Sequence, residues 1–192
     1  MTGKIHYAEQ TGPSVFAFTT EHFREAQKII ARYPEGRQQS ALMPLLTLAQ
    51  KQHGWLPKAA MDYIAMLLSM APVRVYEVAT FYTMYNLEPV GRHVIEVCTT
   101  TPCWLRGSDA IVAACEKHLG ITCGETTADG SFTLREVECL GACVNAPMCQ
   151  VEETYYEDLT PESMVKLIET FERGEQPQPG PQNGRRSSEP AK

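Results

Sequence analysis

The chain has 192 residues, 43% of them hydrophobic, which is enough for one or two domains with a real core. Its 17 Lys and Arg residues against 23 Asp and Glu residues give a net charge of −6, which argues against nucleic acid or an anionic membrane surface as a partner. No apolar run approaches the roughly 18–20 residues that cross a bilayer, and residues 1–16 show neither a secretory core nor an Arg-rich transit pattern. The sequence predicts a soluble protein in a cytosol-like compartment, whose contact with any membrane comes through partners.

The first half of the chain shows a helical period. Residues 1–18 have no clear periodicity and are predicted to form an N-terminal arm, whereas residues 19–88 predict a helical domain. Four apolar stripes are bounded by the start and stop signals Thr19 or Thr20, Pro34, Gly54, Pro57 and Pro72. Pro44 lies inside the second stripe and predicts either a late start or a kink. Short connections favour an antiparallel helical bundle.

The fourth predicted helix is rich in aromatic residues. Its expected inner side carries Val75, Val78, Ala79 and Tyr82. Aromatic side chains over residues 76–85 occur around more than one face, which is expected of a buried helix and also of a surface that binds a partner. Both interpretations stay open.

After Pro89 and Gly91 the period changes from 3.6 to 2. Strands are predicted over residues 93–98, 132–137, 148–152 and 155–156, with a helix capped by Ser108 and a last helix that starts at Thr160. The order β-α-β-β-α over residues 89–174 fits a small open α/β sheet of thioredoxin-like type, so the predicted class is α+β. Residues 175–192 are rich in Pro, Gly, Gln and Ser, and this composition predicts disorder.

All seven cysteines lie between residues 98 and 149. Their odd number and the missing signal peptide argue against a secreted disulfide framework. Cys98 and Cys103 are separated by four residues, and Cys139 and Cys143 by three. Each pair follows a predicted strand, so two loops at the same end of a sheet can bring four thiolates together.

Four thiolates in two pairs suit a [2Fe–2S] cluster, because each iron takes two protein thiolates beside two bridging sulfides. Gly141 would let backbone amides approach the sulfurs, the threonines at 99–101 offer amides and hydroxyls, and Arg106 is expected to offset negative charge. Structural zinc also uses four cysteines at similar spacings. Disulfides and a dithiol redox site are further alternatives, although no C-x-x-C is present. Spacing alone favours iron–sulfur without deciding.

The remaining candidates predict packing rather than chemistry. Cys115 lies on the inward stripe of its helix, Cys149 opens a strand, and Cys123 has no evident role. The five histidines are scattered, with no metal-ligand spacing between them. G-x-G-x-x-G, Walker and G-x-S-x-G motifs are absent, so the chain is not expected to bind a nicotinamide or flavin by itself.

Two runs around the cysteine pairs carry a resemblance to a known family. Residues 97–107 read VCTTTPCWLRG and residues 137–147 read VECLGACVNAP. These runs resemble the two cluster motifs of the family formed by the small [2Fe–2S] subunit of respiratory complex I, the NADH-quinone oxidoreductase. Residues 52–57, 75–82 and 155–161 are similar to other parts of that family, and the resemblance covers the chain from about residue 15 onward.

The resemblance implies one [2Fe–2S] cluster on Cys98, Cys103, Cys139 and Cys143, in a thioredoxin-like ferredoxin domain that follows a helical bundle. It implies an electron carrier that exchanges single electrons with the FMN of a larger flavoprotein subunit, on which NADH, FMN and a [4Fe–4S] cluster are expected. It also implies a place in a peripheral arm, on the cytoplasmic side of a bacterial inner membrane or the matrix side in a mitochondrion.

Three points stay open at the level of sequence. The same module in an NAD-linked hydrogenase or formate dehydrogenase is a rival interpretation, and a zinc-stabilised interaction domain is a rival of another class. The tail at 175–192 is expected to be mobile in the free chain and to dock on the flavoprotein subunit through Arg185 and Arg186. Its deletion is expected to weaken assembly while leaving the cluster spectrum intact.

Overall fold

The structure is a computed structural model that describes residues 12–189. The chain divides into two compact units, Met1–Pro89 and Val90–Lys192. Residues 1–11 of the predicted arm, with His6, and residues 190–192 of the predicted tail lie outside the described residues. Among the described residues, no helix is long and apolar enough to cross a membrane.

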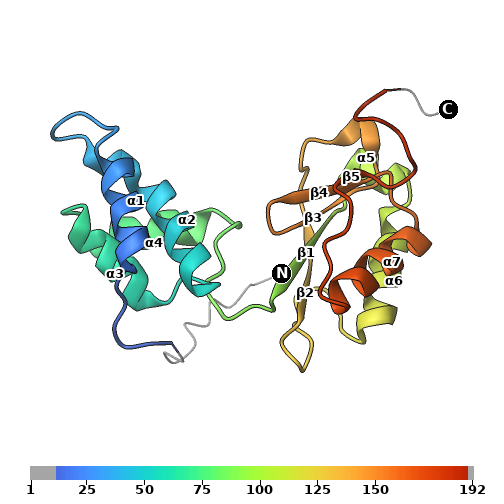
Figure 1. Cartoon of the computed structure of the whole chain (residues 1–192), viewed down its shortest axis with the longest axis horizontal. Coiled ribbons are helices and arrows are strands. Elements are labelled where there is room, and N and C mark those ends of the chain that lie inside the picture. Colours follow the sequence, from blue (N-terminus) through green and yellow to red (C-terminus); the bar gives the residue numbers. More distant parts are fainter. Residues whose placement is uncertain (1–11, 190–192) are drawn as a thin grey trace. The chain divides into compact units, whose positions relative to one another are not determined.

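The first unit is helical (Figure 1). Its elements are α1 (Thr20–Ile30), the 3-10 turn η1 (Gln38–Ala41), α2 (Leu42–His53), α3 (Lys58–Leu67) and α4 (Pro72–Phe81). Thr19 caps α1 by accepting a hydrogen bond from the backbone N–H of His22. The predicted late start is not found, because α2 begins at Leu42, the first residue of the stripe; Pro44 is the third residue of the helix, where its missing N–H removes no hydrogen bond.

The core of this unit is built from leucine, isoleucine and alanine side chains of all four helices. Phe16 and Phe18, which precede α1, are both buried and pack edge-on against each other and against Tyr63 of α3. The described end of the predicted arm is therefore part of the core. Two phenylalanines within three residues are too few to show a period, so their burial cannot be predicted from the sequence.

The prediction that Tyr82 lies on the inner side of α4 is wrong. The helix ends at Phe81, and Tyr82 has an extended backbone that turns it out of the helical face. Phe81 is 75% exposed and Tyr82 40% exposed. The interpretation of residues 76–85 as a fully buried helix therefore fails at this end, whereas Val75 and Ala79 are buried as predicted.

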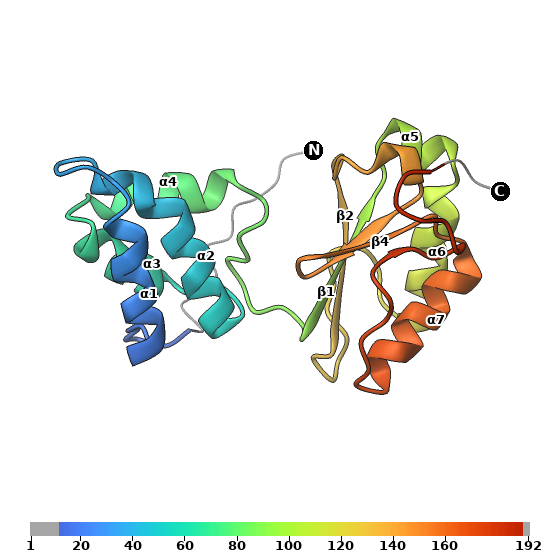
Figure 2. The ribbon, with the colours of Figure 1, turned by 45° about the horizontal axis from the view of Figure 1, so that its top comes forward.

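The second unit is a five-stranded sheet with helices on one face. Its elements are β1 (His93–Cys98), α5 (Thr101–Leu105), α6 (Ser108–Leu119), β2 (Phe132–Val137), the 3-10 turn η2 (Cys143–Asn145), β3 (Cys149–Val151), β4 (Thr154–Glu157), α7 (Pro161–Glu172) and β5 (Gly180–Pro181). The strand order is β2-β1-β3-β4-β5, with β1 parallel to β2 and antiparallel to β3. Figures 1 and 2 both show α6 and α7 on the same side of the sheet.

The predicted order of strands and long helices is confirmed, with two local differences. Helix α5 is absent from the predicted elements, because five residues are too few to show a period. Ser108 is not the cap of α6, because Gly107 occupies that position with φ +93° and Ser108 is the first helical residue. The predicted start of α7 holds, since Thr160 and Ser163 form a reciprocal capping box.

The tail differs most from its prediction. Composition predicts disorder, but residues 180–181 form β5 and pair with the edge strand β4. Figure 1 shows the segment after α7 running back along this edge of the sheet. A main-chain hydrogen bond of 2.9 Å from Gln182 N–H to Glu157 O extends the pairing. The tail thus gains order from an open sheet edge rather than from apolar burial of its own.

Candidate metal centre

The four predicted ligand cysteines lie where β1 and β2 end. Cys98 is the last residue of β1 and Cys103 lies in α5, directly after it. Cys139 and Cys143 lie in the connection that follows β2, with Cys143 at the start of η2. Cys98 and Val137 are the last residues of the parallel strands β1 and β2 and lie opposite each other. Both connections therefore leave the sheet at the same end of these strands. The topology therefore brings the two pairs together.

The thiols interact within and between the pairs. Cys139 Sγ lies 3.4 Å from Cys143 Sγ. The side chains of Cys98 and Cys103 hydrogen-bond to each other. Cys143 in turn interacts electrostatically with both Cys98 and Cys103. Among the described residues, no set of three or more His, Cys, Asp or Glu side chains gathers around a point that a single metal ion could occupy. The arrangement is thus two pairs of thiols.

Hydrogen bonds favour the thiolate form of Cys98. Burial raises the pKa of this thiol, but donors from Thr100 and from the backbone N–H of Leu140 outweigh burial and lower it. The Thr100 hydroxyl lies 3.3 Å from the Cys98 sulfur. Leu140 belongs to the connection that carries the other pair, so its amide joins the two halves of the site. The threonines predict such donors, whereas nothing in the sequence points to Leu140.

Cys103 and Cys143 hold their protons more tightly. Burial, with the hydrogen bond to Cys98, raises the pKa of Cys103 to about 12, although the Met148 amide acts in the opposite direction. The hydrogen bond with Cys139 is the main cause that raises the pKa of Cys143. The charge of a Cys98 thiolate contributes to raising the pKa of both Cys103 and Cys143. A metal cation bound among the sulfurs would relieve the repulsion between these thiolates.

The connection that carries Cys139 and Cys143 is held by two contacts that the sequence does not reveal. The Tyr155 hydroxyl of β4 donates a hydrogen bond of 2.7 Å to the carbonyl of Leu140. Arg106 Nε lies 3.5 Å from the carbonyl of Ala146. Gly141 has φ +88°, a conformation that L side chains avoid. The position of a tyrosine in a predicted strand does not show which group its hydroxyl contacts. The hydrogen bond from Tyr155 to Leu140 therefore cannot be predicted from the sequence.

Of the other three cysteines, Cys115 and Cys149 are placed as the sequence predicts, whereas the sequence makes no prediction for Cys123. Cys115 and Cys149 are fully buried in the core of the second unit, and the Cys149 sulfur lies 3.9 Å from the Met164 sulfur. Cys123 is partly buried, and its backbone N–H donates to Glu116. Burial raises the pKa of Cys115 to about 12, so it is held as a neutral thiol. These three residues pack rather than take part in the site.

The donor set fits a two-iron, two-sulfide cluster. It offers four thiols in two pairs, and backbone N–H groups of Thr100, Leu140 and Met148 directed at two of the sulfurs. Such donors are what an anionic cluster needs from its surroundings.

Comparison with known proteins agrees with this geometry. Residues 26–172 match the model of the family described as thioredoxin-like [2Fe-2S] ferredoxin. The chain is 55% identical over 158 residues to the E subunit of the NADH-quinone oxidoreductase of Rickettsia conorii, covering 82% of this chain and 95% of that protein. It is 50% identical over 175 residues to the mitochondrial NADH dehydrogenase [ubiquinone] flavoprotein 2 of Dictyostelium discoideum, covering 91% of this chain and 71% of that protein.

A solved structure supports the fold. A chain of an NAD+-reducing [NiFe]-hydrogenase in its H2-reduced state superposes with a TM-score of 0.60 at 21% identity, over 67% of this chain. This chain spans 22% of the length of that one, so the likeness concerns a module of a larger protein and shows the fold alone. On the family match and on the identity to its relatives, the chain belongs to the thioredoxin-like [2Fe-2S] ferredoxin family, among the E-type subunits of NADH-quinone oxidoreductases.

Proposed function

We propose that this chain is the electron-transfer subunit of the NADH dehydrogenase module of an NADH:quinone oxidoreductase, with one [2Fe–2S] cluster on Cys98, Cys103, Cys139 and Cys143. The observation that carries the proposal is the convergence of the two cysteine pairs at one edge of the sheet. A bound cluster supplies a one-electron couple. The chain's own part is to hold the four sulfurs and to direct amide and hydroxyl donors at them.

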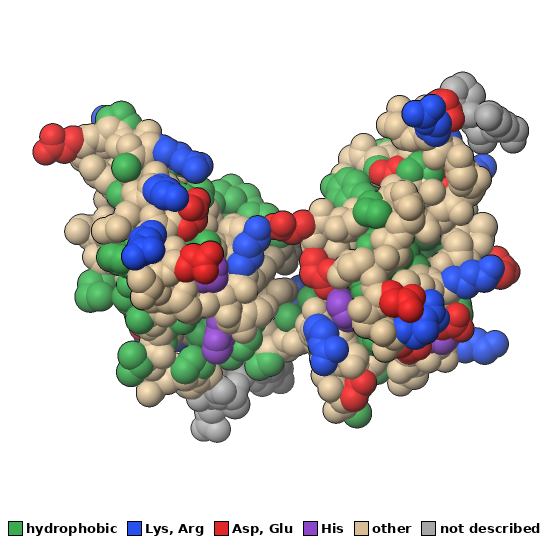
Figure 3. Space-filling model, viewed as in Figure 1, with side chains coloured by type: hydrophobic (Ala, Val, Ile, Leu, Met, Phe, Trp, Pro, Cys, Tyr) green, Lys and Arg blue, Asp and Glu red, His purple; other side chains and the backbone are tan. Residues whose placement is uncertain are grey.

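The exposure of the site supports electron exchange with a partner. Cys139 and Cys143 are exposed, whereas Cys98 and Cys103 are buried. Trp104, Leu105 and Val144, which neighbour the cysteines in sequence, are 56%, 70% and 69% exposed. Figure 3 shows hydrophobic side chains gathered at the end of the second unit where α5 lies. Exposed hydrophobic groups beside a redox site are expected where a partner docks and excludes water.

We propose that this partner is the larger flavoprotein subunit that binds NADH, FMN and a [4Fe–4S] cluster, and that electrons pass singly between its FMN and this chain. Helices α1–α4 are proposed to form an antiparallel bundle within the same peripheral arm. The arm is proposed to lie on the cytoplasmic face of a bacterial inner membrane, or on the matrix face in a mitochondrion. Docking of residues 175–192 on the flavoprotein stays a prediction.

The same module in an NAD-linked hydrogenase or formate dehydrogenase is the second candidate. The fold likeness to a hydrogenase chain agrees with it, but the 55% identity to a subunit of an NADH-quinone oxidoreductase favours the quinone-linked complex. Purification of the tagged chain from its native cells separates these. Co-purification of quinone-side subunits supports the proposal, and co-purification of a [NiFe] or formate-oxidising subunit contradicts it.

Metal analysis tests the site itself. The anaerobically purified full chain is expected to hold about two irons and two acid-labile sulfides, to be red-brown, and to give an electron paramagnetic resonance signal after dithionite reduction. Stoichiometric zinc without labile sulfide would establish the zinc-stabilised interaction domain instead. Titration calorimetry is expected to show no tight NADH or FMN binding to the lone chain, because it has no glycine-rich phosphate loop.

A further inference from the structure

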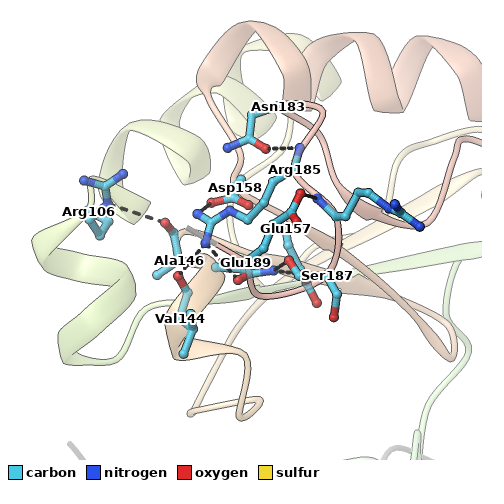
Figure 4. Close-up of polar contacts among 11 residues, drawn as sticks. Arg106, Val144, Ala146, Glu157, Asp158, Asn183, Arg185, Ser187 and Glu189 are labelled. Carbon is cyan, nitrogen blue, oxygen red and sulfur yellow. Dashed lines mark hydrogen bonds and ion pairs between the residues drawn. The ribbon is translucent and has the colours of Figure 1, made fainter. Parts of the chain in front are cut away.

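The described part of the tail reaches the connection that carries Cys143. The side chain of Arg185, only 10% exposed, donates a hydrogen bond of 2.5 Å to Asp158 Oδ1, and the Asp158 side chain is 4% exposed. The same guanidinium donates to the carbonyl of Val144 at 3.4 Å and to Asn145 Oδ1 at 3.3 Å. Val144 and Asn145 directly follow Cys143. Figure 4 shows the Arg185 guanidinium between Asp158 and Val144.

Asn145 links the tail to this connection a second time. Its side-chain amide donates to the carbonyl of Ser187 at 2.8 Å and to Glu157 Oε2 at 2.5 Å. Its backbone carbonyl accepts from the Asp158 N–H at 2.8 Å. The segment after Cys143 is thus tied both to the end of β4 and to the tail, through polar contacts that are mostly shielded from water.

The Arg185–Asp158 pair is the charged centre of this network. Asp158 takes a left-handed backbone conformation with φ +52°, which costs a non-glycine residue some strain. Asp158 Oδ2 and Arg185 Nε are buried and have no further hydrogen-bond partner among the described residues. The buried carboxylate of Asp158 is therefore neutralised by the Arg185 guanidinium. A buried ion pair of this kind contributes more to a defined geometry than to stability.

We propose that Arg185 is a positioning residue for the cluster: it fixes the connection after Cys143 and so sets the direction of the Cys143 sulfur. This inference rests on the proposed function, because it takes Cys143 as a ligand. It assigns the tail a role within its own chain and replaces the expectation that deletion of the tail leaves the cluster spectrum intact. The Arg185 side chain, expected to pair with carboxylates of another subunit, finds its carboxylate on Asp158.

The test compares full-length variants that carry the cluster. Arg185→Gln removes the three contacts of the guanidinium, and Arg186→Gln is the matched control, because Arg186 is the next residue and is exposed. Cluster loss to a chelator, followed by visible absorbance, is expected to be about tenfold faster in Arg185→Gln, as for other residues that support metal ligands. The Arg186→Gln rate is expected to equal that of the unaltered chain.

Two further variants separate positioning from folding. Arg185→Gln alone leaves a buried unpaired carboxylate and can unfold, so Asp158→Asn/Arg185→Gln removes both charges. The double variant is expected to keep its circular dichroism while its cluster loss stays fast and the paramagnetic resonance signal of its reduced cluster shifts, because the Val144 and Asn145 contacts are still missing. Arg185→Lys keeps the positive charge but lacks the several N–H donors of the planar guanidinium. It is expected to bring the rate of cluster loss part of the way back to that of the unaltered chain.

The outcomes decide between the proposals. A double variant with the cluster lifetime, resonance signal and midpoint potential of the unaltered chain would overturn the positioning role while leaving the proposed function in place. An unaltered chain that takes up no iron or labile sulfide overturns both.

Discussion

The two cysteine pairs of the site are held in different ways. Cys98 and Cys103 lie in a strand and a helix and are 2% and 1% exposed, within a small apolar cluster that includes Ala146 and Met148. Cys139 and Cys143 are exposed and lie in a connection whose shape depends on side-chain contacts, from Tyr155 at one end and Arg185 at the other. One half of the site is thus fixed by burial and backbone hydrogen bonding, and the other by polar contacts that reach it from distant parts of the chain.

This difference shows how a small sheet can combine a rigid site with an accessible one. The buried pair of sulfurs is shielded from water and oxidants, and the exposed pair is accessible to solvent and to the proposed partner. The exposed connection is held by hydrogen bonds from residues elsewhere in the chain, Tyr155 and Arg185. The two halves are therefore expected to respond differently to change.

Replacement of the ligands is expected to have the largest effect. Alanine at Cys98, Cys103, Cys139 or Cys143 is expected to abolish the cluster, measured as iron and labile sulfide per chain. The halves are expected to differ in the cluster-free chain, where Cys98→Ala lowers the free energy of unfolding by about 1 kcal/mol because it removes a buried sulfur. Cys139→Ala is expected to change it by less than about 0.5 kcal/mol.

Cys115→Ala is the control for these variants, because Cys115 is buried in the core away from the site. It is expected to keep the cluster. A Cys115 variant without cluster, beside a Cys143→Ala variant with its full spectrum, would show that the ligand set is assigned wrongly.

Alkylation is expected to distinguish the pairs directly. In the folded cluster-free chain, iodoacetamide is expected to modify Cys139 and Cys143 well before the buried pair, because access limits the reaction as much as thiolate content does. Mass spectrometry of digested protein gives the order. In the loaded chain all four are expected to be protected. Faster modification of Cys98 than of Cys139 would contradict the contrast in burial.

The buried thiol of Cys115, which lies outside the site, is expected to make the free energy of unfolding depend on pH. Burial raises the pKa of Cys115 from its usual value of 9.0 to about 12. The folded chain therefore holds this proton more tightly than the unfolded one, so the contribution is fully present below about pH 9 and is lost as the pH rises toward 12. The free energy of unfolding is expected to fall over this range, by at most about 1.4 kcal/mol per pH unit for one thiol.

Urea unfolding of the cluster-free chain at several pH values measures this slope. Cys115→Ala is expected to reduce it, since the titrating group is removed. An identical slope in both chains would show that Cys115 does not carry the effect.

Among the variants that touch the site, Tyr155→Phe is expected to have the smallest effect on the cluster. It removes the hydroxyl that donates to the Leu140 carbonyl and keeps the ring, so the free energy of unfolding is expected to fall by about 1 kcal/mol. Cluster loss to a chelator is expected to rise modestly, with the change confined to the exposed half of the site. Tyr156→Phe tests the same change at a neighbouring buried ring, and a larger effect on the cluster there would contradict the role given to Tyr155.

Sequence reasoning predicts the parts of the molecule that depend on period and on turn residues. The strands from His93 and from Phe132 begin and end where predicted, as does the start of the last helix after Thr160. The cysteine pairs converge because a parallel pair of strands ends at one edge, a consequence of topology that spacing alone can anticipate.

Features that depend on a single long-range contact lie beyond such reasoning. Arg185 is expected from sequence to seek a carboxylate on another subunit, because nothing local points to Asp158, 27 residues earlier. The tail has the composition of a disordered segment. Composition alone cannot show that β4 leaves one side open, with which residues 180–181 pair. Helix α5 is too short for periodicity, and Tyr82 leaves its helix where the backbone becomes extended.

The contact from Arg185 also bears on the order in which the molecule is made. A ribosome releases the chain from its N-terminal side, so all four cysteines emerge before the residue that fixes the second pair. Until Arg185 has emerged, the connection after Cys143 lacks the hydrogen bonds from its guanidinium to Val144 and Asn145. The polar contacts of the exposed connection with Arg185 are thus completed only after all four proposed ligands have been synthesised.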